Sequence, residues 1–159
     1  MNILFVCTGN TCRSPMAAYI TEKVAVENDL DILIESAGVF AEEGEAASEY
    51  AIQAMSEMGI DLTSHRTQPV SEDLLSKADV VLTMTNGQKM LVEQYAPEKT
   101  FTLNEYAGLT GDISDPFGGD IEEYRETAQE IYDAVVDMAE KLPMKNSDDN
   151  NLRNERSVY

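Results

Sequence analysis

A short apolar run that ends in a cysteine and leads directly into a helix constrains this chain most strongly. Residues 3–7 (ILFVC) have the length and composition of a strand that is buried in a parallel sheet. Ser14 is expected to cap the next helix and Pro15 to take its first position, and apolar spacing extends that helix to about Glu27. The residues between, TGNTCR, form a loop that runs from a strand to a helix N-terminus.

The rest of the chain repeats this alternation of strands and helices. The patterns predict strands over residues 31–36, 79–84 and 100–103, and helices over residues 46–58, 71–78, 86–95 and 121–142. Such alternation is typical of an α/β fold, a parallel sheet with helices on both faces. Ligands of these sheets bind beyond the carboxyl ends of the strands, where the opening loop leaves the first strand.

Length and composition favour one domain. The chain has 159 residues and 43% of them are hydrophobic, so we expect residues 1–142 to form a single folded domain. Residues 143–159 are polar, and we expect them to form a disordered tail. No signal peptide or membrane span is recognisable, and two cysteines close together cannot form a disulfide framework. These features favour a cytoplasmic protein.

The charge is strongly acidic. Thirty acidic residues against 11 basic ones give a formal net charge of −19. Such a surface repels the phosphates of nucleic acids and of anionic membranes, so we expect neither as a partner. The charge serves either solubility alone or the attraction of basic protein substrates.

The opening loop has the features of a phosphate site. A loop that enters a helix N-terminus directs backbone N–H groups and the positive end of the helix dipole at one point. Gly9 and Asn10 permit the tight backbone angles that such a loop needs, and Arg13 adds a planar set of donors for phosphate oxygens. The lysine of a Walker P-loop is missing, which argues against a nucleoside triphosphate.

Cys7 lies at the start of the same loop. A helix N-terminus and an adjacent arginine lower the pKa of a thiol, so Cys7 is expected to be a reactive thiolate that faces a bound phosphorus. A cysteine at a strand end is, by itself, more often a small buried residue. The full pattern, a cysteine, five residues, an arginine and then Ser-Pro, favours chemistry.

The loop CTGNTCRS resembles the signature of the low-molecular-weight protein-tyrosine-phosphatase family. The resemblance continues through ESAGV, GIDLTSHR, DVVLTM, FTLNEY and DPFGG, and reaches about Leu142. It implies a flavodoxin-like fold with a four-stranded parallel sheet, and cysteine-dependent hydrolysis of phosphorylated proteins without a cofactor or metal.

The resemblance also assigns roles to individual residues. It implies that Cys7 is the nucleophile, that Arg13 clamps the phosphate and that Asp115, in an Asp-Pro loop, is the general acid and base. By itself, Asp115-Pro116 would be an ordinary turn. The resemblance further implies a phosphate-binding loop that consists of Thr8, Gly9, Asn10, Thr11, Cys12, Arg13 and Ser14.

Supporting roles follow from the same resemblance. A polar network that holds the loop in shape would consist of Asn10, Ser14, Ser36 and His65, and Ser14 would also help the thiolate to leave. Cys12 matches a residue that can form a protective disulfide with the nucleophile under oxidants. A small buried loop residue is an equally good interpretation of Cys12.

Two positions bear on the substrate. The threonine at position 11 resembles the residue that the bacterial protein-arginine phosphatases of the family have there. These phosphatases act in the stress response. Many tyrosine-directed members carry an aliphatic residue instead of Thr11. Its hydroxyl can form a hydrogen bond, and one polar contact in a pocket shifts selectivity strongly. Directly after Asp-Pro, tyrosine-directed relatives often have a pair of aromatic residues, whereas here Phe117 is followed by Gly118 and Gly119. We therefore predict phosphoarginine as the substrate, with phosphotyrosine as the alternative.

Three remoter functions share parts of this pattern. An arsenate reductase would need further cysteines, and none follows Cys12. A phosphocarrier would preserve its phosphocysteine, whereas Asp115 and Thr11 suit hydrolysis. A non-catalytic phosphopeptide-binding module would bind equally well without the Cys7 thiol and would show no turnover.

Overall fold

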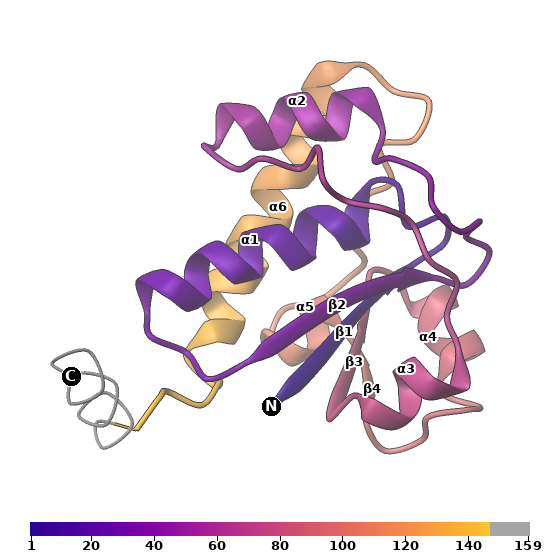
Figure 1. Ribbon diagram of the computed structural model, residues 1–159, viewed down its shortest axis with the longest axis vertical. Coiled ribbons are helices and arrows are strands. Elements are labelled where there is room, and N and C mark those ends of the chain that lie inside the picture. The colour runs from indigo at the N-terminus through magenta and orange to yellow at the C-terminus, as the bar shows by residue number, and fades with distance from the viewer. Residues whose placement is uncertain (147–159) are drawn as a thin grey trace, which may run out of the picture.

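The computed structural model describes residues 1–146, and a four-stranded parallel sheet forms its centre (Figure 1). The strands are β1 (Asn2–Cys7), β2 (Leu33–Gly38), β3 (Val80–Thr83) and β4 (Thr100–Thr102), in the spatial order β2-β1-β3-β4. All neighbours pair in parallel. The sequence therefore predicted the number of strands and the α/β class correctly.

Helices cover both faces of the sheet (Figure 1). One apolar cluster joins the sheet to helices α1, α2, α5 and α6, and a second joins it to α3 and α4. The bounds are α1 Arg13–Glu27, α2 Glu49–Glu57, α3 Glu72–Lys77, α4 Asn86–Val92, α5 Leu103–Tyr106 and α6 Ile121–Ala139.

The two clusters share β1, because successive side chains of a strand point to opposite faces. Ile3, Phe5 and Cys7 belong to the cluster with α1 and α6, while Leu4 and Val6 belong to the one with α3 and α4. All five side chains are buried. Alternation thus directs the Cys7 side chain toward the side of α1, the helix that follows it.

The strand order changes direction at β1, and this places the opening loop. The chain passes from β1 outward to β2 and then returns to β3 on the other side of β1. A crevice forms at such a switch point beyond the carboxyl ends of the strands. Cys7 is the last residue of β1, so the loop that follows it lies at this crevice.

Helix α1 begins earlier than the sequence predicted. It begins at Arg13, and its N-cap residue Cys12 makes no side-chain capping hydrogen bond, so the prediction of Ser14 as the cap was wrong. The Ser14 hydroxyl is instead within hydrogen-bonding distance of Cys7 and Asn10. The sequence shows that Ser14 could cap a helix, but not that its hydroxyl forms hydrogen bonds with other residues.

Other boundaries differ by a few residues. Strand β2 begins at Leu33 rather than at residue 31, and α2 begins at Glu49, where Ser48 caps it. The short helix α5 was not predicted, although Thr102 and Glu105 form a capping box at its start. Four residues are too short a run for apolar periodicity to show a helix.

The described chain continues a little past the expected end of the domain. Pro143 O accepts a hydrogen bond from Asp31 N, and Lys145 N donates one to Asp29 O, so these residues pack beside the connection from α1 to β2. The rest of the expected tail, residues 147–159, lies outside the described residues. Within residues 1–146, no helix has the length and apolarity needed to cross a membrane.

Candidate active site

The loop after β1 folds into a cradle, residues 7–14, around the Cys7 sulfur. Cys7 is only 3% exposed. Its Sγ accepts a hydrogen bond from the backbone N–H of Asn10 at 3.3 Å and lies 2.8 Å from Ser14 Oγ. The sulfur is therefore held from two sides at the carboxyl end of β1.

Asn10 organises the cradle from its centre. It is fully buried and has a φ of +57°, the left-handed conformation that asparagine tolerates better than most residues. Its side-chain amide donates to Ser14 Oγ at 2.8 Å and to Ser36 Oγ at 3.0 Å. Both amide hydrogens are therefore used within the site.

The acceptors of Asn10 are used as well. Its Oδ1 accepts from the backbone N–H of Gln68 at 3.0 Å, and its carbonyl oxygen lies 2.8 Å from Nε2 of His65. A carbonyl oxygen only accepts, so Nε2 carries the proton in this contact. Burial lowers the pKa of His65, which keeps the ring neutral and in a structural role. Asn10 thus joins three distant segments of the chain through one residue.

The Asn10 contact orients the Ser14 hydroxyl. Ser14 Oγ accepts a hydrogen bond from Asn10, so its own hydrogen is left for an acceptor: the Cys7 sulfur at 2.8 Å or the more distant Ala37 O at 3.4 Å. A hydroxyl that donates to sulfur stabilises the thiolate more than the thiol. The arrangement therefore suits a sulfur that carries negative charge during a reaction.

The pKa of Cys7 differs from the expectation. Burial raises the pKa of the thiol above its ordinary value, while the hydrogen bonds of Ser14 and Asn10 and the charge of Arg13 lower it by less. The sequence predicted a lowered pKa from the helix N-terminus and the arginine. It could not show how deeply the thiol is buried, and this burial outweighs the groups that lower the pKa.

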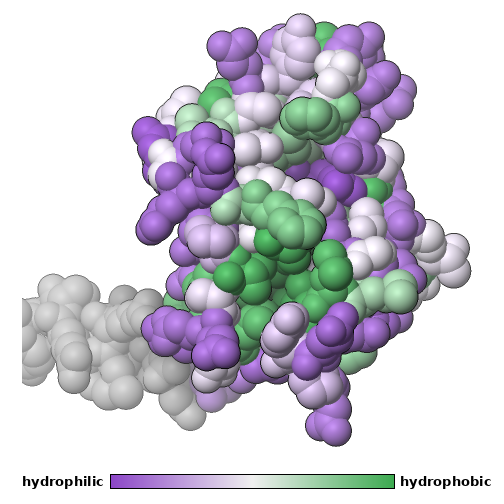
Figure 2. Space-filling view, turned by 90° about the vertical axis from the view of Figure 1, so that its right-hand side faces the viewer, coloured by the Kyte–Doolittle hydropathy of each residue, from purple (hydrophilic) through white to green (hydrophobic). Residues whose placement is uncertain are grey.

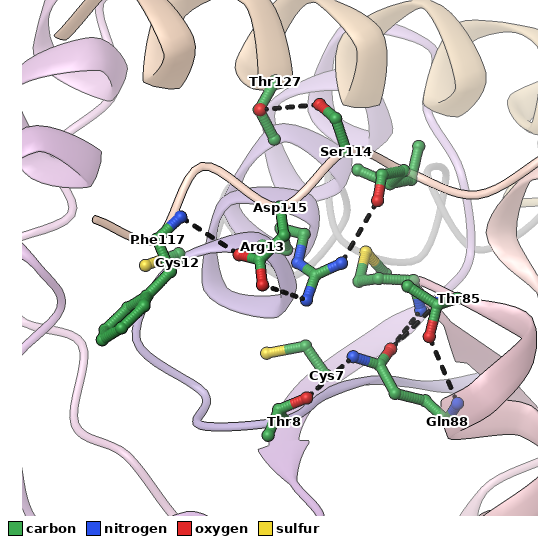
Figure 3. Close-up of polar contacts among 12 residues, drawn as sticks. Cys7, Thr8, Cys12, Arg13, Thr85, Gln88, Ser114, Asp115, Phe117 and Thr127 are labelled. Carbon is green, nitrogen blue, oxygen red and sulfur yellow. Dashed lines mark hydrogen bonds and ion pairs between the residues drawn. The ribbon is translucent and has the colours of Figure 1, made fainter. Parts of the chain in front are cut away.

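Arg13 extends from the first residue of α1 toward the Asp115 loop, residues 113–119. Its guanidinium is buried, donates from Nη1 to Ile113 O at 3.2 Å and lies, through Nη2, 3.4 Å from Asp115 Oδ2. Figure 3 shows this guanidinium between the Asp115 carboxylate and the backbone acceptor, close to Cys7. Cys7 and Arg13 of the cradle are thus brought together with Asp115 of a distant loop.

The Asp115 loop is anchored at its start and exposed beyond it. Ser114 Oγ lies 2.9 Å from Thr127 Oγ1 and 2.8 Å from Glu130 Oε2, both on α6. Beyond this anchor, the Asp115 side chain is 58% exposed and Phe117 is 79% exposed. The Phe117 N–H donates to Asp115 Oδ1 at 3.1 Å, which orients the carboxylate within the loop.

Thr11 and Cys12 contact each other on the side of the cradle near α2 and α6. Thr11 Oγ1 lies 3.6 Å from Cys12 Sγ, and that sulfur lies 3.4 Å from Ser48 Oγ and 3.5 Å from the hydroxyl of Tyr124. Burial raises the pKa of Tyr124 to about 12, so its hydroxyl stays protonated. Cys7 and Cys12 are both free thiols.

Gln88 is a residue of the site that sequence reasoning missed. It is buried on α4, and its Nε2 donates to Thr8 Oγ1 at 3.1 Å, while its Oε1 accepts from the N–H groups of Met84 and Thr85. Figure 3 shows this amide between Thr8 and Thr85. The spacing Thr-x-x-Gln, from Thr85 to Gln88, is a local signal, but only of a capping box. The contact with Thr8 depends on the sheet order, which local sequence does not contain.

Arg13 and Asp115 open onto a hollow of about 570 Å³, a common size for ligand sites. Thr8 and Gln88 line it on one side, and Phe40 on another. A second hollow, of about 530 Å³, lies at the opposite ends of the strands near Asn2. Parallel sheets bind their ligands beyond the carboxyl ends of the strands, so the first hollow is the better candidate for the active site.

Within residues 1–146, no three His, Cys, Asp or Glu side chains lie close enough together to hold a metal ion. The charges that face Cys7 and Arg13 are those of side chains and backbone amides.

Comparison with known proteins agrees with this geometry. Residues 2–148 match the family model described as low molecular weight phosphotyrosine protein phosphatase. The chain belongs to this family. The sequence resemblance that was expected from the loop motifs is thereby confirmed.

Individual relatives carry two kinds of name. The protein-arginine-phosphatase of Bacillus subtilis is 42% identical over 146 residues, which cover 89% of this chain and 97% of that protein. The low molecular weight protein-tyrosine-phosphatase PtpB of Staphylococcus epidermidis is also 42% identical, over 137 residues that cover 85% and 94%. Overall identity therefore does not separate the two substrate classes.

A solved structure shares the fold almost completely. It is a YwlE arginine phosphatase mutant with a phosphorylated active-site serine, and it superposes with a TM-score of 0.86 at 41% identity, covering 89% of this chain and 95% of that chain. The flavodoxin-like, four-stranded architecture is thus the one that the family shares.

Proposed function

We propose that this chain is a cysteine-dependent protein phosphatase that hydrolyses phosphoarginine in proteins of the cytoplasm. The observation that carries the proposal is the convergence of the buried Cys7 sulfur, the Arg13 guanidinium and the Asp115 carboxylate at the crevice of the sheet. These groups supply a nucleophile, a clamp for anionic oxygens and a proton donor.

The first step transfers the phosphoryl group to sulfur. The cycle starts from the Cys7 thiolate, whose proton has passed to solvent, and its Sγ forms a bond to phosphorus as the bond to the leaving nitrogen or oxygen breaks. Protonated Asp115 gives its proton to that leaving group, because a neutral leaving group departs more easily. Arg13 and the cradle amides stabilise the charge on the three remaining oxygens.

The second step releases phosphate. Asp115, now a carboxylate, removes a proton from water, whose oxygen attacks phosphorus as the sulfur–phosphorus bond breaks. The Ser14 hydroxyl, 2.8 Å from the sulfur, donates to the departing thiolate. Asp115 ends protonated, Cys7 is again a thiolate and inorganic phosphate leaves, so the cycle consumes only the substrate and water.

Phosphoarginine is favoured over phosphotyrosine by the groups near Asp115. Its carboxylate already pairs with one guanidinium, that of Arg13, at 3.4 Å and is still 58% exposed. A second carboxylate, Asp112, lines the same hollow. Phe117, two residues after Asp115, exposes an aromatic face that can stack on a planar guanidinium. The Bacillus subtilis relative carries the corresponding name.

Thr11 is the proposed specificity residue within the cradle. Its side chain contacts Cys12 and is not among the residues that line the hollow, so its effect would act through the shape of the cradle. We expect Thr11→Ile to shift the ratio of kcat/KM from phosphoarginine toward phosphotyrosine. An unchanged ratio would remove Thr11 from this role.

The test of the proposal compares two substrates on one enzyme. Peptides that differ only in phosphoarginine or phosphotyrosine are hydrolysed by the purified protein, with Cys7→Ser as the background. We expect kcat/KM for phosphoarginine to be higher by at least about tenfold. A preference for phosphotyrosine would support the second candidate, a tyrosine phosphatase, which the Staphylococcus relative's name favours.

A further inference from the structure

One wall of the hollow at the active site has no role in the chemistry described so far. Val39, Phe40 and Leu91 line the hollow together with Arg13 and Asp115. Phe40 is 75% exposed and Leu91 is 45% exposed. We call these three residues the apolar arm.

The apolar arm belongs to the face that carries the active site. In Figure 1 the strands point toward the right, and Figure 2 looks onto that side. Figure 2 shows hydrophobic side chains gathered in a hollowed part of this face, bordered by hydrophilic ones. An exposed apolar patch with a polar rim marks a surface that binds another molecule.

The backbone holds Phe40 rigidly although its side chain is exposed. Phe40 N donates to Thr8 O at 2.9 Å, and Val39 N donates to Cys7 O at 3.0 Å, so this segment is bonded directly to the cradle. Gly38 permits the close approach, since a Cβ there would lie 2.6 Å from Thr8 O. An aromatic side chain on so fixed a backbone loses little freedom on binding, which is the property of a recognition anchor.

Leu91 faces the hollow from a second fixed element. Helix α4 begins with a capping box formed by Thr85 and Gln88, and Gln88 also binds Thr8 in the cradle. Both sides of the apolar arm are thus tied to the loop that would hold the phosphoryl group. A ligand that spans the hollow would meet charged groups at one end and apolar groups at the other.

We propose that the apolar arm binds an apolar side chain of the protein substrate, one or two residues from the phosphorylated residue. The arm and the Arg13–Asp115 pair line one hollow of about 570 Å³, and an extended chain advances about 3.3 Å per residue, so side chains one or two residues away stay within reach of it. The apolar arm lines the same hollow as Arg13 and Asp115. A polypeptide whose phosphorylated residue is bound there therefore places its neighbouring residues at the arm. This inference rests on the proposed function and adds a sequence preference to it.

A matrix of peptides and variants tests this preference. Phosphoarginine peptides carry leucine or alanine at each of the two positions before and after the phosphorylated residue. We expect leucine to raise kcat/KM about tenfold at one of these positions, mainly through KM, and this advantage to disappear in Phe40→Ser and in Leu91→Ser.

Tyr95 provides a matched control. Its aromatic side chain is also 75% exposed and does not line the hollow, so Tyr95→Ser should keep the full leucine advantage. Equal rates for leucine and alanine peptides in the wild type, or an advantage that Phe40→Ser and Leu91→Ser retain, would overturn the inference. Free phosphoarginine, measured in parallel on the wild type, tests the proposed function itself, because its hydrolysis needs no neighbouring residue.

Discussion

The cradle and the Asp115 loop meet at Arg13 but are built in opposite ways. In the cradle, Asn10 and Ser14 are fully buried, and the side-chain amide of Asn10 uses both its donors and its acceptor. In the Asp115 loop, Asp115 and Phe117 are mostly exposed, and only the segment before them is anchored to α6.

This difference matches the two tasks that the chemistry sets. A site that stabilises charge on phosphoryl oxygens works best when its donors are fixed before the reaction, because no reorganisation is then needed. A proton donor must leave room for substrates of different size and then act as a base toward water. A buried network and an exposed carboxylate serve these tasks separately.

The largest effect is expected from Asp115→Asn, which removes the acid and base but leaves the cradle intact. The amide cannot give or take the proton, so kcat should fall by about 10²–10⁴-fold. The fall should be smaller for a phosphate ester with a good leaving group, which needs less protonation. Steady-state kinetics with a series of leaving groups measures this, and a uniform loss across the series would contradict the role.

A substitution within the cradle should instead lower the stability of the fold. Asn10→Ala removes three buried hydrogen bonds of the side chain and leaves Ser36 and the Gln68 N–H without these partners. We expect a loss of about 2–4 kcal/mol in the free energy of unfolding.

Denaturant unfolding of Asn10→Ala beside Asp115→Asn separates the two regions. Asp115→Asn changes an exposed side chain and should stay within about 0.5 kcal/mol of the wild type. Similar free energies of unfolding for the two variants would contradict the view that the cradle contributes to stability and the Asp115 loop does not.

A third prediction concerns the charge that both regions share at Arg13. Asp115 offsets part of the Arg13 charge at 3.4 Å, and that charge lowers the pKa of Cys7. Asp115→Asn should therefore lower the pKa of the thiol, so alkylation of Cys7 should begin at lower pH than in the wild type. The rate of iodoacetamide modification against pH measures this shift, and a shift toward higher pH would contradict the electrostatic argument.

The smallest expected effect is the pH dependence that comes from His65. Burial holds the pKa of His65 below its ordinary value of 6.5, so the unfolded chain takes up a proton first as the pH falls. The stabilisation by His65 is present above about pH 6.5 and is lost as the pH falls through the lower folded pKa. His65→Gln, which keeps a donor for Asn10 O but does not titrate, should lack this component. Melting temperatures between pH 5 and 8 compare the two proteins, and parallel curves would contradict it.

The sequence predicted the parts of this molecule that depend on local pattern. Buried strands such as β1 and β3 show as apolar runs, and the cradle shows as a compact motif of eight residues. The left-handed backbone of Asn10 also followed from its residue type.

What the sequence did not predict depends on contacts between distant segments. The bond of Gln88 to Thr8 and the pairing of Arg13 with Asp115 join residues that are 80 and about 100 positions apart. The raised pKa of Cys7 follows from burial of the thiol, which depends on the packed fold and could not be read from the loop alone. The resemblance to a family supplied the role of Asp115, for which local pattern indicated only a turn.

The measurement that tests the central claim most directly is the mass of the trapped phosphoenzyme. Protein mixed with a phosphoarginine peptide and quenched within the first turnover should carry one phosphoryl group on Cys7. With a phosphate ester whose good leaving group needs less protonation in the first step, Asp115→Asn should accumulate more phosphoenzyme than the wild type, because its second step is slowed. A phosphoryl group on another residue, or turnover at the wild-type rate in Cys7→Ser, would contradict the account.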